Sequence, residues 1–201
     1  MSVDDFGNWD PGPLEPGERL FIDTGSHREM AMVDYSLTED RYILSYREAG
    51  EVLTARVMQG EMADLLVFPI LFAYRHWLEL QLKSIIALGQ RWRSEEVKPM
   101  HTHKLEVLWP IAREAIQTAF PDDPADLDTI ASIVDELVAI DPESMSFRYS
   151  RDRKGQINLP TGLERINIGH VASVMQKVGL LLDGAADGMA DMLANAEDYG
   201  P

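Results

Sequence analysis

Three charged residues, Arg75, Glu79 and Lys83, stand four positions apart within the strongly apolar stretch 69–88. Residues at this spacing lie along one side of an α-helix, so the three side chains are expected to form a row of ion pairs. His76 lies beside this row. Because leucine, isoleucine and tryptophan flank the row, we expect it to be partly withdrawn from water, where charged groups need partners. Two alternatives stay open: the row only stabilises its helix, or it lines a cleft that binds an anionic ligand.

Two further residues are candidates for the same polar cluster. His103 begins an expected helix, and its ring can donate a hydrogen bond to Glu79 or to the backbone, which would fix the preceding loop. Arg148 lies between Phe147 and Tyr149. We expect a guanidinium between aromatic residues to enter a polar pocket against an acid such as Glu79. A packing role for the histidine and a solvated loop for the arginine are the alternatives.

A second kind of chemistry is suggested by Arg165 and His170, which four residues separate. In a metal-independent ribonuclease, an imidazole moves the proton of a 2′-hydroxyl and an arginine stabilises the charge that develops on the phosphate. An offset of five residues separates two side chains by about 140° on a regular helix. We therefore expect both to reach one phosphate only if the backbone deviates near Gly169. Capping or packing is the alternative role for this pair.

Neither a metal nor a cofactor is expected. The sequence contains no cysteine, and it lacks the motifs of a phosphate-binding loop, a serine hydrolase elbow, a zinc protease helix and a dinucleotide-binding turn. His101 and His103 alone are a weak metal signal, because no third ligand follows at a suitable spacing.

Composition and charge narrow the class of protein. The chain of 201 residues is 45% hydrophobic and 26% charged, as expected of a folded intracellular domain. Its formal net charge of -16 disfavours non-specific binding to nucleic acid or anionic lipid, although a local basic site is compatible with it. Charged residues interrupt the longest apolar stretch, which argues against a membrane span. We expect a cytoplasmic protein with no membrane contact.

The hydrophobic pattern predicts an all-α bundle of four to five helices. An extended or flexible arm is expected over 1–38, with a short strand at 19–23. Helical patterns cover 39–58, 62–92, 103–120, 125–140 and 162–182, and bends are expected at Pro69 and Pro110. Short strands at 146–150 and 156–159 are expected to form a polar hairpin. The last helix is expected to continue as a weaker, glycine-broken segment into an acidic tail, 184–201.

Five motifs stand in a particular order: Tyr46-Arg-Glu-Ala49, Phe68-Pro-Ile70, Tyr74-Arg-His-Trp-Leu-Glu-Leu-Gln-Leu-Lys83, His103-Lys-Leu-Glu-Val-Leu-Trp109 and Phe147-Arg-Tyr149. In this order they resemble the HEPN superfamily, and more narrowly a group of bacterial HEPN-like proteins with the same motifs. The resemblance spans about 40–183, so a HEPN-like domain is expected over 39–183.

The resemblance implies a four- or five-helix bundle that is usually a dimer. Many HEPN proteins are ribonucleases of toxin–antitoxin, abortive-infection and other antiviral systems, whereas others lack the catalytic pair and bind nucleotides or partner proteins. Arg165 and His170 match the superfamily's Arg-x4–6-His pattern and would be catalytic; the position after the arginine, often polar in active members, is Ile166 here. The narrower group is marked by Arg75, His76, Glu79, Lys83, His103 and Arg148.

The leading hypothesis is a metal-independent ribonuclease of a bacterial defence or toxin–antitoxin system, with an antitoxin or other operon-encoded partner protein. A homodimer is expected, because a long helix with a broad apolar face suits pairing between identical copies. Two alternatives remain. One is a non-catalytic dimeric binding or scaffold module, and the other is a nucleotide-binding module that uses Arg75, Lys83 and Arg148 against phosphate.

Overall fold

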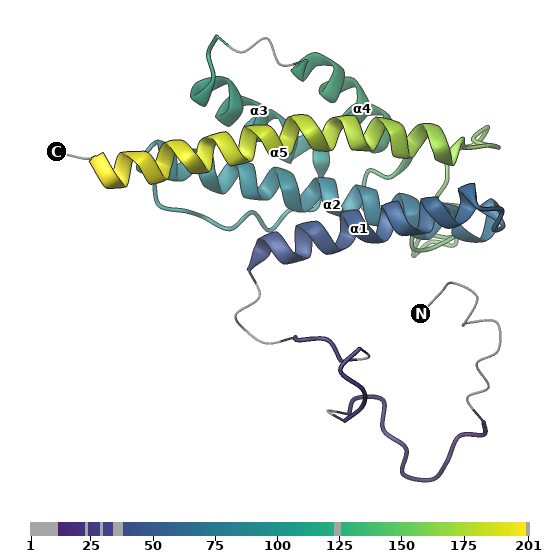
Figure 1. Cartoon of the computed structure of the whole chain (residues 1–201). Helices are drawn as coiled ribbons and strands as arrows, with labels where there is room; N and C mark the ends of the chain where they lie inside the picture. The colour runs from purple at the N-terminus through teal and green to yellow at the C-terminus, as the bar shows by residue number, and fades with distance from the viewer. Residues whose placement is uncertain (1–11, 23, 29, 34–37, 123–125, 200–201) are drawn as a thin grey trace. The chain divides into compact units, whose positions relative to one another are not determined.

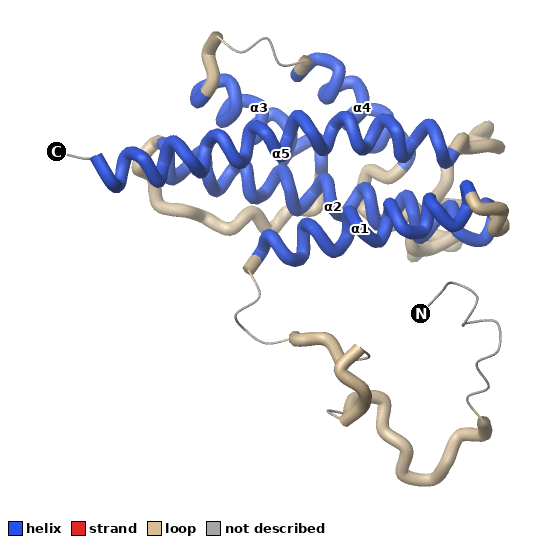
Figure 2. Tube along the Cα trace, viewed as in Figure 1, coloured by secondary structure: helices blue, strands red, loops and turns tan. Residues whose placement is uncertain are grey.

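The computed structural model of the chain describes residues 12–22, 24–28, 30–33, 38–122 and 126–199. The chain divides into two units, 1–36 and 37–201. The described part of the first unit has neither helix nor strand, and its tube in Figure 2 is loop. The strand expected at 19–23 is therefore wrong for residues 19–22, because no described segment of this unit pairs with their backbone; residue 23 lies outside the described residues.

Helices make up most of the described part of the second unit, which confirms the all-α class. They are α1 (Glu39–Met58), α2 (Ala63–Trp92), α3 (Leu105–Ala119), α4 (Leu127–Ile140) and α5 (Ile168–Tyr199). The prediction of a hairpin with strands at 146–150 and 156–159 is wrong, because neither segment forms a strand. Among the described residues its pairing is reduced to one antiparallel bridge between Arg151 and Ile157.

The longest apolar helix lies at the centre of the helical unit. α2 packs against α1, α3 and α5, while α4 packs against α3, and Figure 1 shows α1, α2 and α5 running side by side. Burial of leucine and isoleucine side chains drives this packing. The fully buried side chains of α2 include Ile70, Leu78, Leu82 and Ile85. The helix that carries the charged row is therefore enclosed on several sides, and its buried polar side chains, Arg75, Glu79 and Gln81, contact neighbouring elements.

Both internal prolines are accommodated within continuous helices. Pro69 lies in α2 and Pro110 in α3, and neither helix is interrupted there. A proline in a helix removes one backbone hydrogen bond, which costs about 3 kcal/mol. Each of these helices offsets that loss by burying a wide apolar face, with Leu108 and Trp109 buried directly before Pro110.

The last helix differs most from its prediction. It begins at Ile168 instead of residue 162, and it continues without a break to Tyr199. Asn167 sets the start, because its side-chain oxygen accepts a hydrogen bond from the backbone N–H of His170 at 3.0 Å. The expected glycine break is wrong as well. The Phe120 ring packs so closely on Gly188 that an added Cβ would lie 2.9 Å from it.

Candidate functional site

The charged row on α2 is buried. Arg75 Nη1 donates to Glu79 Oε2 at 3.0 Å, and Lys83 Nζ donates to Glu79 Oε1 at 2.8 Å. The Arg75 and Glu79 side chains are each 1% exposed, whereas Lys83 is 21% exposed. Charged groups withdrawn from water to this degree are costly unless each one is paired. The row is therefore an ionic network, of which only the lysine end reaches the surface.

Arg75 also connects α2 to two segments that are distant in the sequence. Its Nη2 donates to the backbone carbonyl of His103 at 2.8 Å, and its Nε lies 2.9 Å from Asp141 Oδ2. The Nε–H is poorly aligned with that oxygen, so this contact is an ion pair and not a hydrogen bond. Asp141 Oδ1 accepts the backbone N–H groups of Met145 and Ser146 at 2.6 and 2.7 Å. We call Arg75, Glu79, Lys83, His103 and Asp141 the α2 cluster.

His103 is the most exposed member of the α2 cluster. Its side chain is 66% exposed, yet its Nδ1 lies 2.7 Å from Glu79 Oε1. Burial alone would raise the pKa of Glu79, but hydrogen bonds from Lys83 and His103 outweigh it, so the pKa lies below its ordinary value. Glu79 is thus ionised near neutral pH and can only accept hydrogen bonds.

His76 packs against aromatic rings beside the α2 cluster. Its ring stacks on Phe72 at 5.6 Å and meets the edge of Tyr46 at 4.3 Å between centroids. Its Nδ1 lies 4.0 Å from Glu79 Oε2, beyond hydrogen-bond reach. Burial lowers the pKa of His76, and the attraction of Glu79 offsets this only in part. His76 is therefore mainly neutral at pH 7.

Arg148 does not enter a buried pocket, and the expectation that it pairs with Glu79 is wrong. It is exposed, and its Nε donates to the backbone carbonyl of Ser144 at 2.8 Å. Its guanidinium lies over Phe72 and Tyr149, 5.6 and 5.8 Å from their centroids. The acid that reaches Arg75 from this part of the chain is Asp141, which sequence reasoning treated only as the end of a helix. The pair Asp141-Pro142 indicates only the end of an apolar helix, and nothing in the sequence identifies Asp141 as the partner of Arg75.

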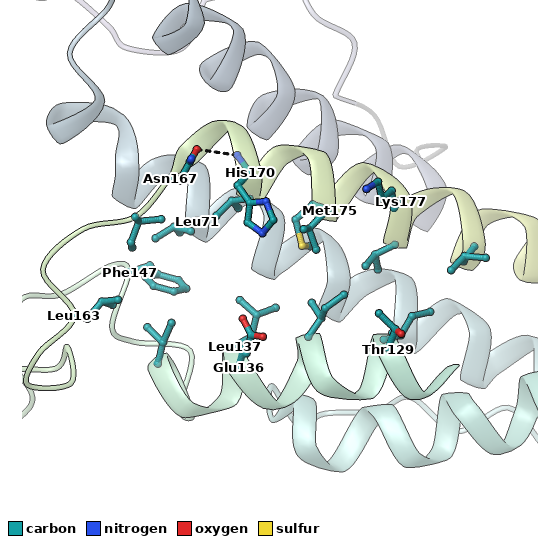
Figure 3. Close-up of a pocket in the computed structure, with 18 of the residues that line it drawn as sticks. Leu71, Thr129, Glu136, Leu137, Phe147, Leu163, Asn167, His170, Met175 and Lys177 are labelled. Carbon is teal, nitrogen blue, oxygen red and sulfur yellow. Dashed lines mark hydrogen bonds between the residues drawn. The ribbon is translucent and has the colours of Figure 1, made fainter. Parts of the chain in front are cut away.

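Arg165 and His170 lie away from the α2 cluster, where α5 begins. Arg165 is in the irregular segment before the helix and His170 is in its first turn, and both are exposed. The two residues line one cavity of about 670 Å³ between α4 and α5. Figure 3 shows the His170 ring directed into this space, toward Glu136 and Leu137 of α4. We call Arg165, Asn167 and His170 the α5 site.

The walls of this cavity are mainly apolar. Apolar side chains from both helices line it, among them Ile130, Ile133, Leu137, Val171, Val174 and Val178. Its charged residues are Arg165, Lys177, Asp126 and Glu136, so the fixed charges balance. A ligand that carries both an anionic group and an apolar surface fits such a lining.

Two searches within the described residues bear on other kinds of site. No group of three or more histidine, aspartate and glutamate side chains in that part of the chain is arranged to hold a metal ion. None of the described helices combines the length and the hydropathy that a membrane span requires.

The fold and site together define an all-α protein with an ionic network in its central helix. A scan of protein-family models, a search of curated proteins and a search of solved structures found no match to this chain. The resemblance to HEPN proteins therefore stays a prediction, and any function must be argued from the residues themselves.

Proposed function

We propose that this chain is a HEPN-like ribonuclease that cuts RNA without a metal ion and acts in a bacterial defence or toxin–antitoxin system. One structural observation carries the proposal: Arg165 and His170 line the same cavity. On a regular helix their side chains would point about 140° apart. Because α5 begins only at Ile168, Arg165 precedes the helix and that restriction does not apply.

Each residue has a role in this reaction. His170 takes the proton of a 2′-hydroxyl, the 2′-oxygen forms a bond to the adjacent phosphorus, the bond from phosphorus to the 5′-oxygen breaks, and that oxygen takes a proton from water. Arg165 stabilises the negative charge that develops on the phosphate oxygens. The N-terminus of α5 adds the partial positive charge of the helix dipole beside the same phosphate. No step needs a metal ion.

The proposal includes a homodimer and a protein partner. A second copy that packs on the apolar cavity walls would bring a second Arg165 and His170 close to the first pair. A protein encoded beside a toxin, such as an antitoxin, would inhibit it by covering this cavity.

Expression in bacteria tests the proposal directly. We expect the wild-type chain to slow growth and to fragment cellular RNA, and His170→Ala to weaken both effects. Purified wild-type protein should cut single-stranded RNA in the presence of EDTA and leave 2′,3′-cyclic phosphate ends. His27→Ala is the matched control, because His27 is an exposed histidine of the first unit.

Equal growth and equal RNA integrity for wild type and His170→Ala would leave the ribonuclease proposal without support. That result would favour the non-catalytic scaffold, in which the apolar cavity only binds a partner protein. Light scattering of the purified chain would measure the dimer separately, whatever the activity.

A nucleotide-binding role is the second candidate, and one observation favours it. A cavity of about 880 Å³ is lined by Lys83, Arg91 and Lys98. Arg75 and Arg148 are not part of it, and the carboxylates of Glu39, Asp40 and Asp187 offset its positive charge. A nucleotide that binds there would raise the melting temperature in proportion to the logarithm of its concentration. Thermal unfolding with added ATP or AMP measures this effect.

A further inference from the structure

His103 has an exposed ring that binds a buried carboxylate. The side chain is 66% exposed, while the Glu79 carboxylate 2.7 Å from its Nδ1 is 1% exposed. Two residues earlier, His101 is exposed as well, but among the described residues its ring forms no hydrogen bond or ion pair. Of these two neighbouring histidines, the α2 cluster therefore binds the ring of His103 and not the ring of His101.

Arg75 and Glu79 hold His103 at two points. The carboxylate of Glu79 binds the ring, and the guanidinium of Arg75 binds the backbone carbonyl of the same residue at 2.8 Å. Arg75 and Glu79 also bind each other at 3.0 Å. A side chain fixed through both its ring and its backbone is preorganised, as acid–base groups in enzyme sites are.

The contact with Glu79 also fixes the tautomer of His103. An ionised carboxylate only accepts hydrogen bonds, so the proton of the neutral ring must lie on Nδ1. The lone pair is then on Nε2, at the opposite side of a ring that is mostly exposed. This is the arrangement in which a carboxylate orients a histidine as a general base.

Stability alone does not explain why these charges are buried. A buried ion pair costs about as much in lost hydration as it gains in attraction, so apolar residues of similar size would serve a helix as well or better. The α2 cluster contains Arg75, Lys83, Glu79 and Asp141, two charges of each sign. What it achieves beyond packing is a fixed position for His103.

We propose that His103 is the general base of a second site on this protein, positioned by Glu79, and that its substrate is single-stranded RNA. The substrate class rests on the ribonuclease activity proposed above. His103 Nε2 takes the proton of a 2′-hydroxyl; the 2′-oxygen forms a bond to phosphorus, the bond from phosphorus to the 5′-oxygen breaks, and that oxygen takes a proton from water. The exposed Arg148 supplies positive charge on this side of α2, because its guanidinium lies over Phe72, which stacks on His76 beside Glu79.

Cleavage of a labelled RNA oligomer in EDTA by four proteins separates the two sites. They are wild type, His170→Ala, and His170→Ala combined with either His103→Ala or the matched control His101→Ala. Without His170 only the second site cleaves, so we expect the added His103→Ala to lower the remaining cleavage rate about 10²- to 10⁴-fold, and the added His101→Ala to leave it unchanged. A His170→Ala protein without any cleavage, or a double variant with His103→Ala as active as His170→Ala, overturns the second site, whereas the comparison of His170→Ala with wild type judges the α5 site. Wild-type protein that leaves the RNA intact overturns both.

Nitrogen NMR of the histidine rings tests the positioning role of Glu79 without RNA. In wild-type protein near pH 8, we expect the His103 proton on Nδ1. Glu79→Gln should move the ring toward a mixture of tautomers and lower the cleavage rate, an effect that a merely structural glutamate would not have. A wild-type His103 that carries its proton mainly on Nε2 overturns the proposal, whether or not Glu79→Gln folds.

Discussion

The α2 cluster and the α5 site each combine an arginine with a histidine, but the two regions hold them by different means. In the α2 cluster, side chains hold side chains: one helical turn separates Arg75 from Glu79 and Glu79 from Lys83, and the histidine ring is bound to the carboxylate. In the α5 site, the backbone N–H of His170 donates to the Asn167 side chain, and neither Arg165 nor Asn167 forms a hydrogen bond with the His170 ring.

The two regions therefore differ in how firmly the histidine ring is held and in how open its surroundings are to a ligand. A buried carboxylate fixes the ring of His103 but requires a network of four buried or half-buried charges. The ring of His170 needs no such network, because it reaches into an open cavity. The first region is preorganised before any ligand binds, whereas the second must be organised by its ligand or by a second copy of the chain. Each prediction below tests that contrast.

Removing Arg75 should have the largest effect. Arg75→Met leaves the carboxylates of Glu79 and Asp141 buried without this cation, and breaking a buried ion pair costs about 3–5 kcal/mol. Arg165→Ala removes the same charge from an exposed position and should change stability by less than about 0.5 kcal/mol. Urea unfolding followed by circular dichroism measures both. Equal losses for the two variants would mean that the α2 cluster is no more tightly held than the α5 site.

Asp141→Asn should have the next largest effect. The amide oxygen can still accept the backbone N–H groups of Met145 and Ser146, but the ionic attraction to Arg75 is lost. The two backbone N–H groups then bind a neutral oxygen instead of a charged one, and hydrogen bonds to charged groups contribute about 1.5–3 kcal/mol, so the free energy of unfolding should fall by about that amount. Asp128→Asn is the control, since Asp128 forms its ion pair with Arg113 at the surface. A loss no larger than the control's would remove Asp141 from the cluster.

Asn167→Ala should have a smaller effect on stability, and one confined to the α5 site. Loss of a helix N-cap costs about 1 kcal/mol. The first turn of α5 carries His170, so fraying there should also lower any RNA cleavage that depends on His170. Urea unfolding and the oligomer assay together measure this. If Asn167→Ala leaves both unchanged, the cap does not position His170.

The smallest predicted effect is a dependence on pH that arises from Glu79 of the α2 cluster and from His76 beside it. The pKa of Glu79 is below its ordinary 4.5, so its contribution is fully present above pH 4.5 and is lost as the pH falls further. The pKa of His76 in the folded chain is below 6.5. As the pH drops below 6.5, His76 therefore binds a proton more readily in the unfolded chain than in the folded chain, and the free energy of unfolding falls. His76→Phe should remove the second loss in urea unfolding at pH 7.5 and 5.5. His170→Phe, the control, should leave it in place.

Local patterns in the sequence were sufficient for much of this description. Helix periodicity placed the first four helices within two residues of their ends, and the spacing of Arg75, Glu79 and Lys83 predicted one row of ion pairs. These features depend on residues within one or two helical turns of each other. A contact of that range is determined by helix geometry alone.

Features that depend on distant residues were predicted less well. Asp141 pairs with a residue 66 positions earlier, and no pattern in the sequence selects it over other acids. Arg148 was assigned to Glu79, but a nearby carbonyl and two aromatic faces hold it at the surface. The start of α5 was missed because apolar residues before Asn167 continue the helical pattern. The capping preference of asparagine is the signal that would have found it.

The guanidinium of Arg75 binds two loops, the one before α3 and the one after α4. The carbonyl of His103, before α3, and the carboxylate of Asp141, after α4, both contact the guanidinium of the buried Arg75. Loosening either loop therefore strains the other, although more than thirty residues separate them along the chain. Amide hydrogen exchange at the two loops should rise and fall together, so this interior residue would set how often both of those surface segments open.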